Sequence, residues 1–137
     1  MVRLLFALPL ILLFDSFAQA ADSYCWFSGS RLHDGQTVSE TLKVVVSSVD
    51  RPHIAGKPDR RPWCIQSRHS LGGHSSSKII ETPKLGQVHT NGYRLSYRGD
   101  RVGQDRFVIE RRWQNGSSNA WLTGRIIYEV EVLAQPL

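Results

Sequence analysis

The chain has 137 residues, of which 41% are hydrophobic and 21% are charged, and its formal net charge is +5. This length allows one domain with one hydrophobic core. Arginine outnumbers lysine thirteen to four, but no nucleic-acid-reading module accompanies the basic charge, so a nucleic-acid partner is not expected. The charge fits either an anionic partner, such as phosphorylated lipid or acidic polysaccharide, or ordinary solvated strand faces.

The first twenty residues are typical of a cleaved export signal. After a short positive start, residues 4–14 form an apolar run that is too short to span a bilayer as a helix. Residues 18–20 supply a small-x-small cleavage site, so the mature chain is expected to begin at Ala21. We therefore expect 1–20 to be a signal peptide and 21–137 to be a single domain. The expected domain has no apolar stretch long enough to span a bilayer. We therefore expect a periplasmic or secreted product without a transmembrane segment.

Both cysteines, Cys25 and Cys64, lie in the mature chain. In an oxidising compartment, two cysteines most simply form one disulfide. Such a bridge closes a loop of roughly 40 residues, which chain-entropy arithmetic values at about 4 kcal/mol. The alternative is a nucleophilic Cys64 activated by one of the five histidines, although no surrounding motif favours that chemistry.

Short apolar and polar alternations separated by turn residues predict an all-β protein. Loops are expected at 50–62, which holds three prolines, and at the serine-rich 67–77. About seven or eight strands at this spacing indicate an antiparallel β-sandwich. The expected strands are 24–27, 41–49, 63–66, 78–82, 87–89, 93–98, 105–113 and 123–133.

Two hairpins stand out. Asn91-Gly92 is a two-residue turn signal, and Tyr93, Leu95 and Tyr97 follow it on one face. In the last hairpin, a turn centred on Ser117 would place Trp113 directly across from Trp121. The same register puts the apolar sets of the two strands on opposite faces. We therefore expect a one-residue bulge that realigns them.

The run 81–109 resembles the bacterial Ig-like and cadherin-like repeats of exported and surface proteins. Its pattern is P-x-x-G-x-V, a strand ending in tyrosine, then G-x-D-x-F-x-[YVI]. The matching residues are Pro83, Gly86, Val88, Tyr97, Gly103, Asp105, Phe107 and Ile109. The resemblance covers about thirty residues and implies an Ig-like antiparallel sandwich.

The resemblance also implies structural roles. Gly103 would permit a tight turn, Asp105 would accept hydrogen bonds from loop amides, and Phe107 would be a core residue. The sequence departs from the family at Gly99, where a proline is usual, and in a shorter loop before Gly103. Some of these domains bind calcium between tandem copies, but this chain lacks the necessary acidic cluster. No cofactor is expected.

Several short motifs bear on function. His69 and His74, in the serine-rich loop, offer an alternative function as a metal-binding or enzymatic envelope protein. The tripeptide 98–100 spells Arg-Gly-Asp, a motif known from cell-adhesion ligands; the alternative is a turn that needs Gly99. The acceptor-like 115–117 is interpreted as a hairpin turn rather than a glycosylation site.

Trp113 and Trp121 give the most specific binding hypothesis. They are candidate ligand contacts that stack on sugar rings; the alternative is a cross-strand aromatic pair that clamps the hairpin. With no convergent catalytic residues, the sequence predicts a non-enzymatic binding or scaffolding module of the bacterial cell envelope. Its partner would be an envelope protein or a glycan, and an exposed strand edge in a larger assembly is a further alternative.

Overall fold

The computed structural model describes residues 24–49, 63–68 and 74–137, so the expected signal peptide lies outside the described residues. The described residues contain eight strands and no helix, which confirms the all-β prediction. The strands are β1 (Cys25–Phe27), β2 (Thr37–Val45), β3 (Cys64–Ser67), β4 (Ser75–Glu81), β5 (Gly86–Asn91), β6 (Arg94–Gly99), β7 (Gly103–Gln114) and β8 (Trp121–Leu133).

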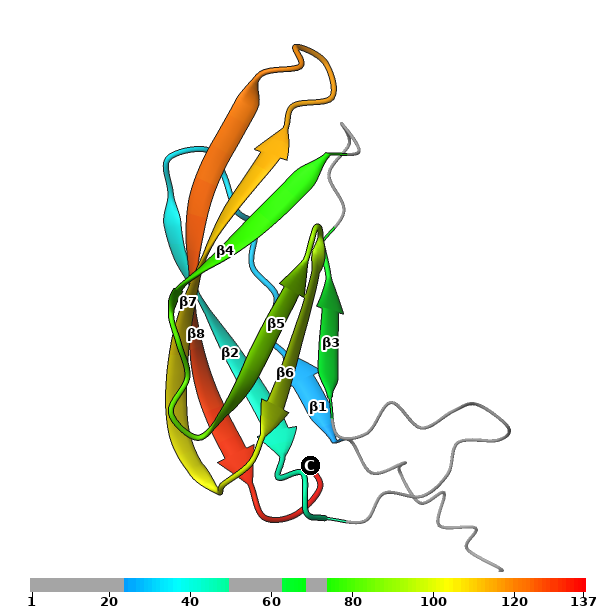
Figure 1. Cartoon of the computed structure of the whole chain (residues 1–137), viewed down its shortest axis with the longest axis vertical. Helices are drawn as coiled ribbons and strands as arrows, with labels where there is room; N and C mark the ends of the chain where they lie inside the picture. Colours follow the sequence, from blue (N-terminus) through cyan, green and yellow to red (C-terminus); the bar gives the residue numbers. More distant parts are fainter. Residues whose placement is uncertain (1–23, 50–62, 69–73) are drawn as a thin grey trace, which may run out of the picture.

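The strands form two sheets, as expected for a β-sandwich (Figure 1). The larger sheet has the order β1-β2-β8-β7-β4, and the smaller has the order β3-β6-β5. Among the described residues, all strand pairings are antiparallel except that of β2 with β8, which is parallel, so the predicted wholly antiparallel arrangement is wrong at this pair. Because β2 pairs with β8 along its whole length, it begins at Thr37, four residues before the predicted start.

The register of the last hairpin differs from the prediction by one residue. Trp113 pairs with Leu122, and Trp121 pairs with Gln114. The connection is an even six-residue turn, 115–120, instead of one centred on Ser117. Phe107 consequently faces Tyr128, and β7 and β8 align their apolar sides without the expected bulge. The irregularity lies instead between β4 and β7, where the register shifts between Ile79 and Glu81.

The turn of the first hairpin is also displaced by one residue. Asn91 pairs with Arg94, so the two loop residues are Gly92 and Tyr93. Gly92 has φ 56°, the positive value that a type II′ turn requires at its first central position. Leu95 and Tyr97 then lie in the core as predicted, whereas Tyr93, predicted on the same face, is a turn residue and 40% exposed.

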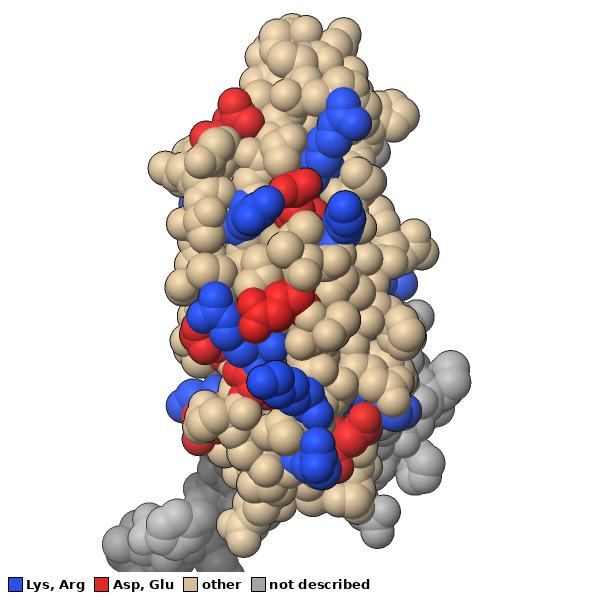
Figure 2. Space-filling model, turned by 60° about the vertical axis from the view of Figure 1, so that its left-hand side comes forward, with Lys and Arg blue, Asp and Glu red and all other residues tan. Residues whose placement is uncertain are grey.

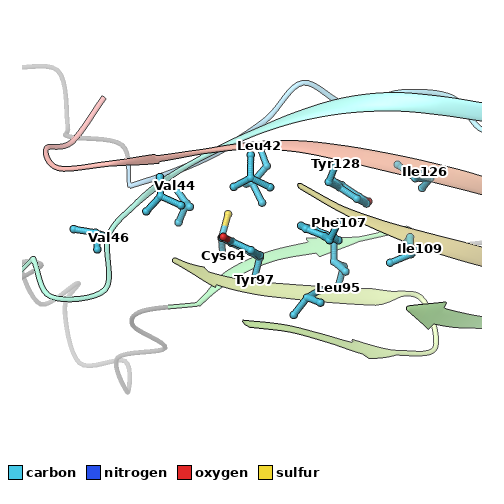
Figure 3. Packing of buried hydrophobic residues seen from close by; sticks show 13 residues of the cluster. Leu42, Val44, Val46, Cys64, Leu95, Tyr97, Phe107, Ile109, Ile126 and Tyr128 are labelled. Carbon is cyan, nitrogen blue, oxygen red and sulfur yellow. The ribbon is translucent and has the colours of Figure 1, made fainter. Parts of the chain in front are cut away.

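Apolar side chains from both sheets form one core (Figure 3). Phe107 lies at its centre, fully buried, and stacks on Tyr128 at 4.6 Å and on Tyr97 at 5.4 Å between ring centroids. Tyr97 belongs to the smaller sheet and the other two rings to the larger one, so this stack joins the sheets. The prediction that Phe107 is a core residue is confirmed.

The predicted disulfide is confirmed: Cys25 and Cys64 are bonded, with their Cα atoms 5.6 Å apart. Cys64 is therefore not a nucleophilic thiol. The bridge ties β1 at the edge of one sheet to β3 in the other. Disulfides are typical of oxidising compartments, which favours a non-cytoplasmic protein. No helix within the described ranges is long and apolar enough to cross a membrane.

The outward face of the larger sheet carries interleaved basic and acidic side chains (Figure 2). Four exposed pairs join neighbouring strands: Lys43–Glu131, Arg106–Glu81, Arg106–Glu129 and Arg125–Glu110. Each such pair contributes about 0–1 kcal/mol. These arginines match the expectation of a solvated strand face.

At one end of the core, Asp105 at the start of β7 accepts four hydrogen bonds. Three come from the backbone amides of Lys84, Leu85 and Arg106, and one from the Tyr97 hydroxyl at 2.8 Å. The predicted bonding to loop amides is confirmed. Gly103, with φ 143°, provides the turn before it. Burial raises the pKa of Asp105, but these hydrogen bonds outweigh burial and leave the pKa below its ordinary value.

Candidate ligand-binding cleft

A second group of buried polar side chains lies at the other end of the core. Glu40 is 1% exposed because it occupies the inward face of β2, in phase with Leu42 and Val44. Its carboxylate pairs with Arg68, which follows β3. It also accepts hydrogen bonds from Gln66 Nε2 at 2.5 Å and Ser30 Oγ at 3.2 Å. The acid is thus held by a cation and two neutral donors.

Arg68 links this group to the 28–36 segment. Its second terminal nitrogen donates to the Ser30 carbonyl at 2.7 Å, while its Nε is buried and has no hydrogen-bond partner among the residues that the structure describes. Gln66 in turn accepts a 2.7 Å hydrogen bond from the Tyr128 hydroxyl. Burial, followed by the charge of Glu40, raises the pKa of Tyr128 above its ordinary value, so the hydroxyl stays a neutral donor.

Arg111 is the third charged member and is 5% exposed. It lies on the inward face of β7, in phase with Phe107 and Ile109, and its guanidinium donates to the Arg68 carbonyl. None of the ion pairs found among the described residues includes Arg111. Burial and the nearby Arg68 charge lower its pKa to about 10, so it remains protonated at neutral pH.

The group therefore has two cations for one carboxylate. Removing a charge from water costs several kcal/mol, roughly, unless an opposite charge compensates it. Arg68 has Glu40 for this purpose, whereas Arg111 has only a carbonyl oxygen among the described residues. Arg111 thus differs from the arginines of the solvated outward face, because the strand's phase turns it toward the interior.

A cleft of about 940 Å³ opens beside this charged group. It has a basic part, an apolar wall and a polar rim. The described residues that line it are Ser30, Arg31, Leu32, Arg68, Arg111, Trp113, Gln114, Asn115, Gly116, Ser117 and Leu122. The β7–β8 hairpin extends past the smaller sheet at this end, so that sheet does not cover the hairpin's inward face there (Figure 1).

One wall of the cleft is the 28–36 segment, which is fastened to β8. Gly35 N donates to the Thr123 carbonyl at 2.8 Å, and Asp34 accepts from Thr123 N at 2.9 Å. Leu32 lies against Gly124, where an added Cβ would meet its Cδ1 at 2.8 Å. A bare glycine on β8 is thus what lets this wall approach the hairpin.

The rim at the hairpin tip is held by a side chain in the turn. Asn115 Oδ1 accepts from Ser117 N at 2.9 Å, Ser117 Oγ at 2.8 Å and Ser118 N at 3.3 Å. Asn119 follows with φ 57°. The interpretation of 115–117 as a hairpin turn is confirmed, and the same turn positions Ser117 at the edge of the cleft.

The two predicted ligand contacts lie on opposite faces of the hairpin. Trp113 shares its face with Arg111 and Leu122 and lines the cleft. Trp121 pairs with Gln114 on the outward face, is 47% exposed, and lies under the Arg112 guanidinium at 4.5 Å. A direct cross-strand tryptophan pair is therefore wrong in register, and the structure brings only Trp113 to the cleft.

The remaining candidates are not gathered there. His69 lies outside the described residues, and His74 is exposed. The described ranges contain no group of three or more His, Cys, Asp or Glu side chains placed to hold a metal ion. In the Arg-Gly-Asp tripeptide, Arg98 and Asp100 pair with each other at 2.8 Å.

Sequence reasoning missed the charged trio of Glu40, Arg68 and Arg111. Glu40 and Arg111 carried a usable signal in the sequence, because a charged residue in the apolar phase of a strand is expected to be buried and paired. Arg68 follows β3 and carried no such signal.

Comparisons with known proteins leave the geometry as the only guide: the chain matches no protein-family model, no curated protein and no solved structure.

Proposed function

We propose that this chain is an exported, non-enzymatic, Ig-like binding module of the bacterial cell envelope, and that its ligand occupies the cleft at the β7–β8 tip. The observation that carries the proposal is the cleft itself, an open hollow lined by arginines and a tryptophan. Binding sites are characteristically concave, largely preformed and lined by apolar side chains with a few placed polar groups.

The strand order supports the Ig-like assignment. In Ig-type sandwiches, one sheet contains strands B, E and D, and the other contains C, F and G. The sheet β3-β6-β5 matches the first set, and the run β8-β7-β4 matches the second. The disulfide departs from the antibody pattern, because it joins β3 to β1 rather than to β7.

A non-enzymatic role is supported by the composition of the cleft. Its lining contains arginines, amides, hydroxyls and apolar side chains, but no histidine, carboxylate or thiol among the described residues. General acid–base catalysis uses a group that exchanges protons near the working pH. The protonated arginines are suited to holding a charge, so the lining favours recognition.

Two experiments test this proposal. Mass spectrometry of the protein recovered after expression with its amino-terminal segment should give a mature start at Ala21; an intact amino terminus would contradict export by cleavage. The ¹⁵N-labelled protein is then titrated with a soluble envelope extract. Amide shifts concentrated at Ser30, Leu32 and Ser117 are expected, whereas no shifts or shifts confined to the outward face would overturn the cleft as the binding site.

A further inference from the structure

We infer that the cleft takes an anionic sugar, with its acidic group on Arg111 and its ring face on Trp113. This inference rests on the proposed binding function and names the ligand class for the same site. Three observations carry it: the unmatched charge of Arg111, the position of Trp113 beside it, and the polar rim.

The charge calls for an anion. Arg31, Arg68 and Arg111 all line the cleft, and the only carboxylate within salt-bridge distance of Arg68 or Arg111 in the described part of the chain is Glu40, paired with Arg68. The Arg111 guanidinium has one hydrogen bond to the described residues, to a carbonyl, although it carries five N–H donors. Planar guanidinium groups bind carboxylates and phosphates through two parallel hydrogen bonds. An anion entering here would balance the buried charge and use those donors.

The neighbouring ring calls for a flat, partly apolar body. Trp113 lies two residues from Arg111 on the same face of β7, which places their Cα atoms roughly 7 Å apart. That separation suits one sugar unit whose acidic substituent reaches Arg111 while its ring lies on the indole. Leu32 and Leu122 complete the apolar wall.

The rim separates a sugar from a lipid tail. Ser30, Gln114, Asn115 and Ser117 present hydroxyl and amide groups around the opening. Each of these side chains already makes a hydrogen bond within the fold, and its remaining lone pairs or N–H donors match the hydroxyls of a sugar chain, whereas an acyl tail can use none of them. The three apolar side chains are also a small lining for a hydrocarbon chain.

The chain provides matched controls on the opposite face of the same strands. Arg112 follows Arg111 but is exposed on the outward face, where it lies over Trp121. The pair R111M and R112M therefore removes the same charge from the two faces. The pair W113L and W121L does the same for the ring.

The test is calorimetric titration of the full chain, purified with its disulfide intact. The probes are trigalacturonate and mannose 6-phosphate as carboxylate and phosphate sources, with trigalacturonate methyl ester as the uncharged control and inorganic phosphate as the anion alone. We expect at least one anionic sugar to bind. If the carboxylate is the group recognised, the methyl ester should bind at least roughly tenfold more weakly than trigalacturonate. Free phosphate should bind more weakly than either sugar that binds.

Among the variants, R111M should weaken that binding by roughly tenfold or more and W113L by roughly fivefold, with R112M and W121L within about twofold of the wild type. The inference would be overturned if neither anionic sugar binds. It would also be overturned if trigalacturonate binds but its methyl ester binds equally well, or if the outward-face variants lose as much affinity as R111M and W113L. If R111M does not fold, the W113L and W121L comparison and the uncharged control decide the question.

The two failures are distinguishable. If envelope extract shifts the cleft amides but neither anionic sugar binds, the ligand class is wrong and the binding function stands. If the extract leaves the cleft unchanged, the proposed function itself fails.

Discussion

Asp105 and Arg111 lie on the inward face of one strand, β7, six residues apart, and both are buried. Asp105 accepts four hydrogen bonds from surrounding groups, including Tyr97, so its charge is fully provided for. Among the described residues, Arg111 has one carbonyl partner and a second arginine beside it. The buried charge of Asp105 is therefore explained by folding, whereas the buried charge of Arg111 remains available to a ligand in the cleft.

Asp105 and Arg111 thus differ in how completely their buried charges are matched by hydrogen bonds. A buried group whose hydrogen bonds are complete is explained by the fold alone. A buried group that stays incompletely matched costs stability, and folds keep such groups mainly where function requires them. Asp105 belongs to the first class and Arg111 to the second.

The largest expected effect comes from removing the one acid of the charged trio. Glu40→Gln leaves Arg68 and Arg111 together without a carboxylate, so the free energy of unfolding should fall by about 3–5 kcal/mol in urea titration. The double variant E40Q/R111M restores the original charge balance and should recover part of that loss. Strictly additive effects would contradict electrostatic coupling within the trio.

The next largest loss of stability is expected from replacing Asp105, at the other end of the core. Asp105→Ala leaves the Lys84 and Leu85 amides and the Tyr97 hydroxyl without their acceptor, which should cost about 3 kcal/mol in the same titration. Asp100→Ala is the control, because this aspartate is exposed and its pair with Arg98 contributes about 0–1 kcal/mol. Equal losses in the two variants would show that Asp105 is not a structural acceptor.

Acid titration sharpens the same contrast. Because the pKa of Asp105 is lowered in the folded protein, its stabilisation is present above the ordinary pKa of 3.8 and is lost as the pH falls through the folded value. The stability difference between wild type and Asp105→Asn should therefore be largest near neutral pH and shrink below about pH 4. A difference that stays constant with pH would indicate lost packing rather than lost charge.

The smallest change in stability is expected from replacing Arg111, the second cation of the charged trio. Arg111→Met removes a buried charge that lacks a carboxylate but also a hydrogen bond to Arg68, so the free energy of unfolding should change by no more than about 1 kcal/mol, in either direction. Thermal unfolding without ligand measures this. A loss as large as that of Asp105→Ala would mean that Arg111 serves the fold and not the cleft.

Much of the fold could be predicted because it depends on local patterns. Each predicted strand overlaps one of the eight observed strands, although β4 begins at Ser75 within the expected 67–77 loop, and two cysteines predicted the disulfide. The motif around Asp105 predicted its bonding, because aspartates beside turns recurrently accept backbone amides. The strand patterns depend on residues near one another in sequence, whereas the disulfide spans 39 residues and was predictable because two cysteines allow one pairing.

The cleft could not be predicted because it depends on long-range placement. Glu40, Arg68 and Arg111 come from three separate strands or their ends, and only the parallel pairing of β2 with β8 places Glu40 near the hairpin. The face of Trp113 follows from the alternation of β7, but the face of Trp121 depends on whether the last turn has an even number of residues. One residue in that turn decides whether Trp121 shares the face of Trp113.

The most direct measurement of the central claim observes Arg111 itself. Side-chain Nε–Hε resonances of the ¹⁵N-arginine-labelled protein, assigned with R111M and R112M, are followed during titration with trigalacturonate and mannose 6-phosphate. The account predicts that the Arg111 resonance shifts with saturation, with the Arg112 resonance unchanged. Movement of Arg112 alone, or of neither resonance with both sugars, would contradict the assignment of Arg111 as the anion-binding group of the cleft.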